Sequence, residues 1–423
     1  MCSFPPVDKY IYFQVHICIG MKRTNTFSVR FKDNNEVLAL ANGCSALWDV
    51  LNYKRRQSFF AGNFDWDSSK EYKSFATNVG SATAQQIICK NNTAWRVFFK
   101  LLKMKGEGEL KDVRKVSPPG YWKDRNTNKV IPRILIRNDC YKIKGRTIRL
   151  PKRIRGRIMG NLKWTGKQGL LEIRYDTLKH KWYAYQPVET QAISQPIRHN
   201  HAYVDLGVRY PITSVIESVQ KPIAYNGTPL LMDWWYYNKR IAEHQSELKR
   251  CTGKNTSSRL KKLYQTRQRR FRNAINNYVS NFVKRCEDSG VSEIVVGDLT
   301  GIRNNASKGT KTNTMINNFW GHRYLTERIQ ITAENHGITV SFVDERGTSS
   351  VCPRCGSDDK IRRGRLFKCK ACGLEAHRDC VGAFNISLVH GSHHEGDGNW
   401  VMTHPEVVND FVSFHTNSLK GTP

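Results

Sequence analysis

Four cysteines in two C-x-x-C pairs are the residues whose types and spacing point most directly to chemistry. They are Cys352, Cys355, Cys369 and Cys372. Each C-x-x-C turn presents two sulfurs to one ion, so the four thiolates predict a closed, structural zinc site. Two disulfides are the alternative, which a reducing compartment disfavours. The segment between the pairs is basic and includes Arg363 and Arg365, so we expect a zinc ribbon with a cationic finger.

Acidic residues at the ends of expected strands form a second candidate site. Asp205 interrupts an apolar strand, Asp298 ends the next one, Asp344 and Glu345 end a third, and Asp379 begins a helix. An acid in a buried strand costs stability unless it is paired or binds a cation. Several carboxylates around a metal pair hydrolyse phosphodiesters, and hard oxygen ligands select magnesium or manganese. These residues therefore predict a metal-dependent nuclease.

The charge of the chain points to a polyanion partner. The 423 residues carry 68 Lys and Arg against 36 Asp and Glu, a formal net charge of +32. Many cations that neutralise phosphates give sequence-independent affinity for nucleic acid, although ribosomal and membrane-surface proteins are equally basic. We find no apolar run that would span a bilayer and no signal peptide. The expectation is a soluble protein of the prokaryotic cytoplasm or nucleoid.

The sequence of the first half of the chain predicts strands interrupted by helices. Residues 10–31 predict a hairpin with a turn near Lys22 to Asn25, residues 35–105 are helical, and strand-like segments follow up to about Glu189. These strands would close a small barrel with a basic outer face. Cations expected to contact nucleic acid on it include Arg146, Arg149, Arg153 and Arg155. Arg55 and Arg56 lie among aromatic residues, which suits base stacking, although an aromatic stripe is more often plain core.

The second half alternates strands with helices, which is typical of an α/β domain. A long helical stretch from about Trp234 to Cys286 is broken at 252–258, which predicts two antiparallel helices. One face is apolar and the other is basic, with Arg267 and Arg270 among its cations. A solvated face is possible, but few carboxylates offset the repulsion, so we expect a nucleic-acid groove.

Several segments of the second half resemble one known family. They are DLG at Asp205, VVGDLTGIR, DERGTSSVCPRCGS, FKCKACG and HRDCVGAFNI, in this order. The resemblance is to the transposon-encoded TnpB proteins and the related small type V CRISPR effectors. It implies a split RNase H-like (RuvC) nuclease domain with a zinc-binding insertion. It also implies an RNA-guided DNA endonuclease whose partners are guide RNA and double-stranded target DNA, with specificity set by base pairing.

The resemblance assigns two catalytic acids to residues of this chain, but the third acid has no counterpart at the usual position. Asp205 matches the first catalytic aspartate and Asp379 the last, but the usual middle glutamate falls on Gly297. Neighbouring strands are about 4.8 Å apart, so a glutamate on the next strand can lean toward the same metals. We therefore expect Glu345 to replace the missing acid and to bind magnesium with the two aspartates. Asp298 is the alternative acid, with Asp344 as a further fallback.

The predicted fold class is an α+β multidomain protein, with an N-terminal β-barrel and a C-terminal α/β RuvC-like domain that carries the zinc ribbon. The expected parts are a nucleic-acid-binding barrel (1–34 and 107–197), a helical recognition insertion (35–106), the nuclease domain (198–348 and 377–388), the ribbon (349–376) and a flexible tail (389–423). Histidines in the tail, such as His390, are more typical of an unstructured segment than of a metal site.

Two other functions stay open at this point. A nuclease-inactive relative would bind DNA through guide RNA and act as a repressor or targeting module. A DNA-strand transferase or resolvase would share the fold, and fold alone does not fix function. The sequence leaves open the guide RNA, the flanking DNA motif and whether the protein acts as a monomer or as a dimer on one RNA.

Overall fold

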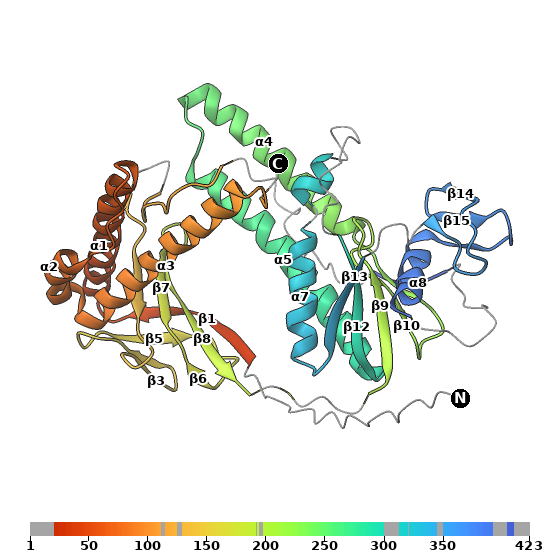
Figure 1. Ribbon diagram of the computed structural model, residues 1–423, viewed down its shortest axis with the longest axis horizontal. Coiled ribbons are helices and arrows are strands. Elements are labelled where there is room, and N and C mark those ends of the chain that lie inside the picture. Colours follow the sequence, from red (N-terminus) through yellow and green to blue (C-terminus); the bar gives the residue numbers. More distant parts are fainter. Residues whose placement is uncertain are drawn as a thin grey trace, which may run out of the picture. The chain divides into compact units, whose positions relative to one another are not determined.

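A computed structural model of the chain describes residues 21–110, 115–124, 129–191, 193, 198–299, 313–319, 321–344, 350–391 and 404–409. The chain divides into two units, Met1–Ala192 (unit 1) and Ile193–Pro423 (unit 2), whose elements are labelled in Figure 1. Within the described ranges, every helix is too short or too polar to cross a lipid bilayer.

Unit 1 contains an antiparallel sheet. Its strands are β1 (Met21–Phe31), β2 (Arg133–Ile136), β3 (Lys142–Lys144), β4 (Thr147–Arg149), β5 (Arg155–Met159), β6 (Lys167–Gln168), β7 (Leu171–Asp176) and β8 (Lys181–Thr190). They run in the order β2-β7-β8-β1-β5-β4-β3, and β6 pairs with β8. Among the described strands no pairing joins β2 to β3, so the expected barrel is a half-barrel.

The strand β1 passes straight through the turn that the sequence predicted. Residues Met21 to Val29 pair one by one with Thr190 to Trp182 of β8. Asn25 is 3% exposed, and its side chain donates to Gln186 of β8 and to the carbonyl of Trp164. The prediction of a turn at residues 22–25 was wrong because this buried amide is held within the sheet. The first strand of the predicted hairpin lies outside the described residues.

Three helices follow β1 in unit 1: α1 (Asn34–Phe60), α2 (Ser69–Val79) and α3 (Ser81–Gly106). The Asp33 side chain caps α1 by accepting from the backbone N–H of Asn35 at 2.7 Å. Apolar residues at helical spacing pack α1 onto the half-barrel, including Leu40, Cys44 and Trp48. The ring of Trp48 stacks on Trp122 with the centroids 4.6 Å apart.

Unit 2 contains a mixed sheet of six strands in the order β13-β12-β9-β10-β11-β17. The bounds are β9 (Asn200–Asp205), β10 (Thr213–Ile216), β11 (Ile223–Tyr225), β12 (Val291–Asp298), β13 (Thr339–Asp344) and β17 (Glu406–Val408). The three strands β9, β12 and β13 are parallel, so their carboxyl ends meet at one edge. The central residues of β9 and β12 are buried, as expected for strands covered on both faces, whereas the edge strand β13 is partly exposed.

Helices cover both faces of this sheet. They are α4 (Thr228–Thr252), α5 (Ser258–Asp288), the π-helix η1 (Met315–Phe319), α7 (His322–Glu334) and α8 (Arg378–His390). The helices α5 and α7 share a core with one face, whereas α8 packs on the other through Ile386. The predicted break between α4 and α5 is confirmed. Gly253 ends α4 in the left-handed region, with φ +65°, and the Ser257 hydroxyl caps α5.

A small three-stranded sheet holds the cysteines. It consists of β14 (Lys360–Arg363), β15 (Leu366–Cys369) and β16 (Glu375–His377), and it leads directly into α8. Phe367 is fully buried against Val381 and Phe384 of α8, so this four-cysteine domain and α8 share one core. The folding of the four-cysteine domain therefore contributes to the position of α8, which also packs on the six-stranded sheet.

Candidate functional site

Asp205 and Asp379 lie beside one face of the helix α8. Asp205 is the last residue of β9, and Asp379 lies in the first turn of α8. A Cβ atom built on Gly382 would lie only 3.2 Å from Cγ of Asp205. Gly382 follows Asp379 by three residues, so the two positions are neighbours on the helix surface. Burial raises the pKa of the Cys380 thiol, and the charges of Asp379 and Asp205 raise it further. The structure thus brings two of the predicted acids together.

The carboxylate of Asp379 is held by an arginine of the four-cysteine domain. Asp379 is 7% exposed, and Nη1 of Arg365 donates to its Oδ2 and Oδ1 atoms at 2.7 and 2.9 Å. Nε of Arg378 lies 3.5 Å from Oδ1. The Arg365 guanidinium also lies over the ring of Tyr210, 5.6 Å from its centroid. Arg365 therefore places a fixed positive charge beside the predicted active site.

Asp298 and Asp344 lie on the sheet face opposite that of Asp205. The two residues are opposite each other in the strand register, at the ends of β12 and β13. Val296 belongs to the core under α5 and α7, whereas Val295 belongs to the cluster under α8. Successive strand residues point to opposite faces, so Asp298 continues the face of α5 and α7. Asp205 continues the face of α8, and this difference disfavours Asp298 as the alternative acid.

Gly297 occupies the strand position beside Asp205. The parallel pairing of β9 with β12 runs through Val204 and Val296, and the next residues of the two strands are Asp205 and Gly297. A glutamate at this point of β12 would lie next to the first aspartate, but glycine has no side chain. Glu345, which was predicted to replace that acid, lies outside the described residues, so its role stays a prediction.

The four cysteines lie together, as their spacing predicted, in an arrangement that could hold one metal ion. Their sulfurs lie within 4.8 Å of one another, and the pairs Cys352 to Cys372 and Cys355 to Cys369 are each 3.6 Å apart. Four sulfurs about 2.3 Å from one zinc would be about 3.8 Å from each other, so a tetrahedral zinc fits. A disulfide requires sulfurs about 2.0 Å apart, which the geometry excludes.

Two glycines shape the turns of this cysteine site. Gly356 and Gly373 follow the second cysteine of each pair, and both have φ +71°, where other residues are strained. Their backbone N–H groups donate to the carbonyls of Cys352 and Cys369. The N–H of Cys372 lowers the pKa of the Cys369 thiol to about 7. The backbone thus favours the thiolate form at Cys369, whereas burial raises the pKa of the Cys352 thiol to about 12.

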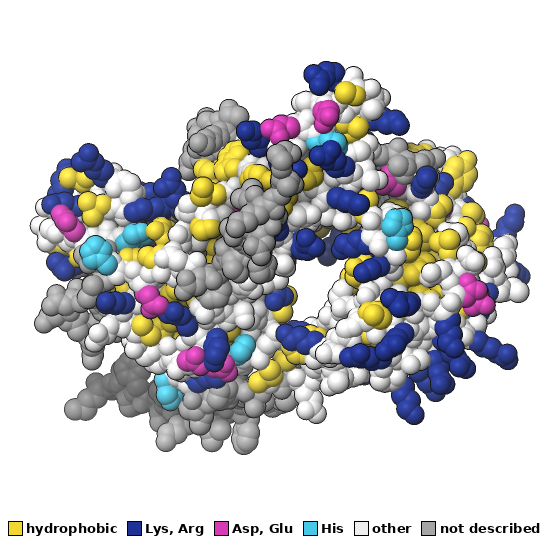
Figure 2. All heavy atoms as spheres, turned by 180° about the vertical axis from the view of Figure 1, so that it is seen from behind, with side chains coloured by type: hydrophobic (Ala, Val, Ile, Leu, Met, Phe, Trp, Pro, Cys, Tyr) yellow, Lys and Arg dark blue, Asp and Glu magenta, His cyan; other side chains and the backbone are white. Residues whose placement is uncertain are grey.

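Cations form a ladder across three strands of the half-barrel. Lys142, Arg149 and Arg155 lie directly opposite one another on β3, β4 and β5. Two residues after Arg155 on β5, and on the same face, Arg157 lies opposite Arg30 of β1. All five are exposed, and Figure 2 shows dark blue side chains gathered over this part of unit 1. Like charges on adjacent strands are destabilising, so this face is suited to a polyanion.

Two more predicted contacts lie next to this ladder. Arg146 and Arg153 occupy turns that flank β4, and both are exposed. Arg153 has φ +60°, and Nη2 of Arg146 lies 3.5 Å from Oδ1 of Asn161. Both cations are accessible for phosphates, so they remain predicted contacts.

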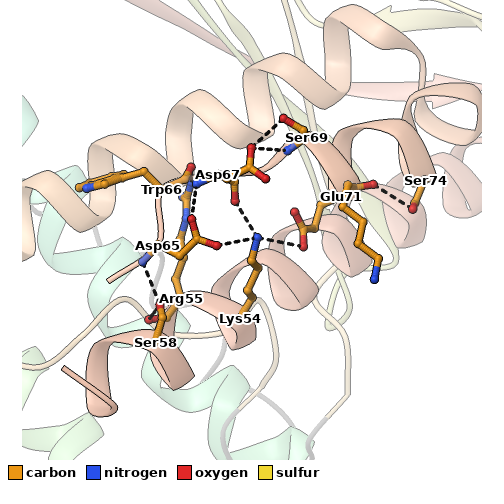
Figure 3. Close-up of polar contacts among 10 residues, drawn as sticks. Lys54, Arg55, Ser58, Asp65, Trp66, Asp67, Ser69, Glu71 and Ser74 are labelled. Atoms are coloured by element: carbon orange, nitrogen blue, oxygen red, sulfur yellow. Dashed lines mark hydrogen bonds and ion pairs between the residues drawn. The ribbon is translucent and has the colours of Figure 1, made fainter. Parts of the chain in front are cut away.

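Arg55 does not lie on the surface. It is fully buried in the helical part of unit 1, where Nη1 donates to Oδ1 of Asn91 at 2.6 Å and Nη2 to the carbonyl of Trp66. Figure 3 shows Arg55 beside Trp66, with Lys54 between Asp65 and Glu71. Burial lowers the pKa of Arg55 to about 10. The prediction that Arg55 contacts nucleic acid was wrong, because its charge is used to join α1 to α3.

The other predicted cations differ in what they contact. Arg56 lies over the rings of Phe60 and Tyr121 and donates to the carbonyl of Pro119 at 3.0 Å. On α5, Arg270 pairs with Asp233 at 2.8 Å. Arg270 therefore has a protein partner that a phosphate would have to replace.

Arg267 and Arg363 complete the predicted set of cations. Arg267 donates to Asn238 and lies over the rings of Trp234 and Tyr264. Arg363 is exposed on β14. Arg363 thus has the exposure of a surface contact, whereas Arg267 is half-buried among aromatic rings.

Comparison with known proteins gives the family. A family model described as "Cas12f1-like, TNB domain" matches residues 322–386, and one described as "Probable transposase" matches residues 185–303. The chain is 32% identical over 382 residues to the TnpB-like protein ORF457 of Acidianus two-tailed virus, which covers 82% of this chain and 81% of that protein. The chain belongs to the TnpB-like family.

More distant similarities of this TnpB-like chain reach CRISPR effectors. It is 26% identical over 231 residues to the CRISPR-associated endodeoxyribonuclease Cas12f1 of Sulfoacidibacillus thermotolerans, so it matches about half (52%) of that protein's length. A solved structure of the mini RNA-guided endonuclease CRISPR-Cas_phi3 matches 90% of this chain and 94% of that chain, at 12% identity and a TM-score of 0.51. The latter similarity concerns the fold alone.

Two features of the site were missed by the sequence reasoning. Arg365 was predicted only as a nucleic-acid contact, and its bond to Asp379 depends on how the β14–β15 hairpin docks on α8. Gly382 was not singled out, although its missing side chain lets α8 approach Asp205. A sequence signal existed for Gly382 alone, because glycine in the middle of a helix is unfavourable and often has a packing reason.

Proposed function

We propose that this TnpB-like protein is an RNA-guided DNA endonuclease that cleaves phosphodiester bonds in double-stranded DNA at sites chosen by pairing with a guide RNA. The observation that supports this most is the placement of Asp205 and Asp379 beside one face of α8, with Arg365 bound to Asp379. Carboxylates and a fixed cation around one point are what phosphodiester hydrolysis requires.

Each part of the chain before residue 389 has a role in this function. Residues 198–348 and 377–388 form the RuvC-like nuclease domain, and residues 349–376 form the zinc ribbon. Residues 1–34 and 107–197 bind the guide RNA and its DNA heteroduplex through the cation ladder, together with the helical insertion of residues 35–106. Residues 389–423, which were predicted to be a flexible tail, are given no role, although α8 extends to His390 and β17 pairs with β11.

Magnesium or manganese ions would be held by Asp205, Asp379 and Glu345. The oxygen donors of the two aspartates suit such hard ions, and the contact with Arg365 holds the Asp379 carboxylate in place. When bound, the ions supply an activated water and stabilise the leaving oxygen. Arg365 orients the Asp379 carboxylate and offers its remaining N–H groups to a non-bridging phosphate oxygen.

The nuclease-inactive alternative is favoured by one observation. Gly297 leaves β12 without an acid next to Asp205, where the resemblance expects a glutamate. If Glu345 does not take over this function, the protein would bind its target without cutting it. The active enzyme is favoured because Asp205 and Asp379 are both kept beside α8, with Arg365 bound to Asp379.

The test is to purify the protein from cells that express it with its flanking DNA, and to sequence the RNA that copurifies. A DNA duplex that matches this RNA is then incubated with the complex and Mg²⁺. The proposal expects cleavage of the matched duplex and none of a duplex with a scrambled target. Specific binding without cleavage by the wild-type complex would support the nuclease-inactive alternative, and absence of RNA would contradict both.

A further inference from the structure

A pocket of about 440 Å³ lies among the helices on the sheet face opposite α8 in unit 2. It lies in the range of roughly 300–1,000 Å³ that is usual for small-ligand sites. The helices α4, α5 and α7 and the π-helix η1 all contribute to its lining. The lining residues are Trp234, Tyr264, Gln265, Arg267, Gln268, Phe271, Arg272, Asn318, Phe319, Gly321 and Tyr324.

Aromatic rings line the pocket from several sides. Trp234 and Phe319 are 4% and 3% exposed, with ring centroids 5.5 Å apart, and Phe271 packs on Phe319 at 5.6 Å. Tyr264 is 39% exposed, so part of its ring is open to a ligand. Gly321 lets the backbone approach Phe271, since a Cβ there would lie 3.2 Å from that ring. The pocket thus offers flat apolar surface to a planar ligand.

The polar groups of the pocket disfavour a cationic ligand. Its lining contains arginine, glutamine and asparagine side chains, and none of its described residues is Asp or Glu. The Arg267 guanidinium lies 5.5 and 5.2 Å from the ring centroids of Trp234 and Tyr264. The amides of Gln265 and Gln268 are exposed at the rim and can both donate and accept hydrogen bonds. This mixture of rings, amides and guanidinium matches a nucleobase and its phosphate.

The surroundings of the pocket favour a strand of nucleic acid over a free nucleotide. The helix α5 carries nine Lys and Arg between Ser258 and Cys286 and no Asp or Glu in that span. Exposed members close to the pocket are Lys262, Arg269 and Arg272. A helix with this charge attracts a continuous phosphate backbone, which would pass the pocket mouth.

We propose that this pocket binds one unstacked base of single-stranded nucleic acid, through stacking on Tyr264 and contacts to Arg267 and Gln268. The inference rests on the proposed function, because it needs a single strand to be bound by unit 2. The pocket is on the opposite face of the sheet from Asp205 and Asp379, so the bound base belongs to a nucleotide other than the one that is cut. Its role is to fix the register of that strand.

The test is photo-cross-linking of the purified complex with nucleic acid in which 5-iodouridine or 5-iododeoxyuridine replaces single pyrimidines. The RNA arm substitutes the copurifying RNA and the DNA arm substitutes the displaced or single-stranded DNA. One substituted position in one arm is expected to give adducts that mass spectrometry maps to Tyr264 or Phe271. Adducts confined to unit 1, or to parts of unit 2 remote from these two residues, would overturn the proposal.

Two substitutions test the same pocket by affinity. Tyr264→Ala is expected to weaken binding of the cross-linked strand about 10-fold, in the range expected for loss of one stacked base. The matched control is Tyr236→Ala on α4, since Tyr236 is 49% exposed and lies outside the pocket. Gln268→Glu places a carboxylate at the exposed rim and is expected to weaken binding without affecting the fold. Unchanged affinity of both pocket variants would contradict the proposal.

The proposed nuclease function and the proposed base-binding pocket can fail separately. If the wild-type complex binds but does not cut matched DNA, the nuclease function fails, whereas the cross-links and the effect of Tyr264→Ala still decide the pocket. If the wild-type complex cuts DNA and neither pocket variant differs from it in strand affinity, the pocket fails and the nuclease function stands.

Discussion

Arg365 donates from Nη1 to both carboxylate oxygens of Asp379, at 2.7 and 2.9 Å, and this pair joins the turn of the β14–β15 hairpin to the first turn of α8. The Arg365 carbonyl also accepts from the N–H of Arg378 at 2.8 Å. The four-cysteine domain is therefore attached to the predicted active site by a side chain and by the backbone. Its folding and the position of the last catalytic acid are linked.

Replacing Arg365 tests that link. Arg365→Ala should lower the rate of DNA cleavage about 100-fold, since one fixed charge at a developing phosphate charge typically has that effect. Arg365→Lys should restore part of the rate, because it keeps the charge and loses the planar guanidinium. Cleavage rates are measured at saturating Mg²⁺. Lys368→Ala is the matched control on the same hairpin, because Lys368 pairs with Glu375 and not with Asp379, and an equal loss in this variant would contradict a specific role for Arg365.

Removing the zinc ion should abolish DNA cleavage, although none of its predicted ligands belongs to the predicted active site. Cys355 is an exposed ligand, so Cys355→Ser removes one thiolate with little change in packing. The hairpin then loses its metal, and hydrogen exchange of β14, β15 and the start of α8 should become faster, with loss of cleavage. Cys251→Ser is the control, because Cys251 is also exposed and lies outside the metal site. Full cleavage by zinc-free protein would contradict the predicted coupling.

The predicted replacement of the missing acid by Glu345 can be tested by placing a glutamate at position 297. Glu345→Ala should abolish cleavage with target binding retained. Adding Gly297→Glu should restore part of it, because residue 297 lies beside Asp205 in the register of β12 and β9. Asp298→Ala should leave most of the activity, since Asp298 follows the opposite face. Full cleavage by Glu345→Ala would show that another group supplies the third acid.

A pH effect is expected in the half-barrel. Glu172 binds Arg174 at 2.6 Å and Lys90 at 2.9 Å. Burial raises the pKa of its carboxyl, but the hydrogen bonds from Arg174 and Lys90 outweigh burial and leave that pKa below its usual value. A lowered folded-state pKa adds stability above the unfolded pKa, and this stability is lost as the pH falls through the folded pKa.

Glu172→Gln should therefore destabilise unit 1 by about 1–3 kcal/mol at pH 7. The difference from wild type should shrink as the pH falls through the lowered folded-state pKa, because the wild-type carboxylate is then protonated as well. Hydrogen exchange of the amides of β2 and β7, corrected for the intrinsic pH dependence, measures it. Glu189→Gln on β8 is the exposed control. A difference that stays constant from pH 7 to pH 3 would contradict the expected linkage.

The features that the sequence predicted are local in the chain. The two C-x-x-C pairs, the end of β9 at Asp205 and the break between α4 and α5 each depend on residues within a few positions. Periodicity and turn chemistry determine such features, and the structure confirms them. The basic face of the half-barrel was predicted for the same reason, since alternation along each short strand puts its charges on one face, whereas the alignment of these charges across strands depends on the register.

The features that the sequence did not predict depend on contacts between distant segments. Arg55 is buried because Asn91, 36 residues later, accepts its hydrogen bond. The turn expected near Asn25 is absent because Gln186 of β8 pairs with it. Neither partner can be identified from one sequence, because the docking of helices and the register of distant strands decide which side chains meet.

An active site built on Asp205 and Asp379 is tested most directly by the single-turnover cleavage of matched DNA by wild type, Asp205→Ala and Asp379→Ala complexes, with target binding measured in parallel. We expect that wild type cleaves in Mg²⁺ and that each variant cleaves at least about 100-fold more slowly, with target affinity retained. Cleavage at the wild-type rate by either variant would contradict an active site built on Asp205 and Asp379.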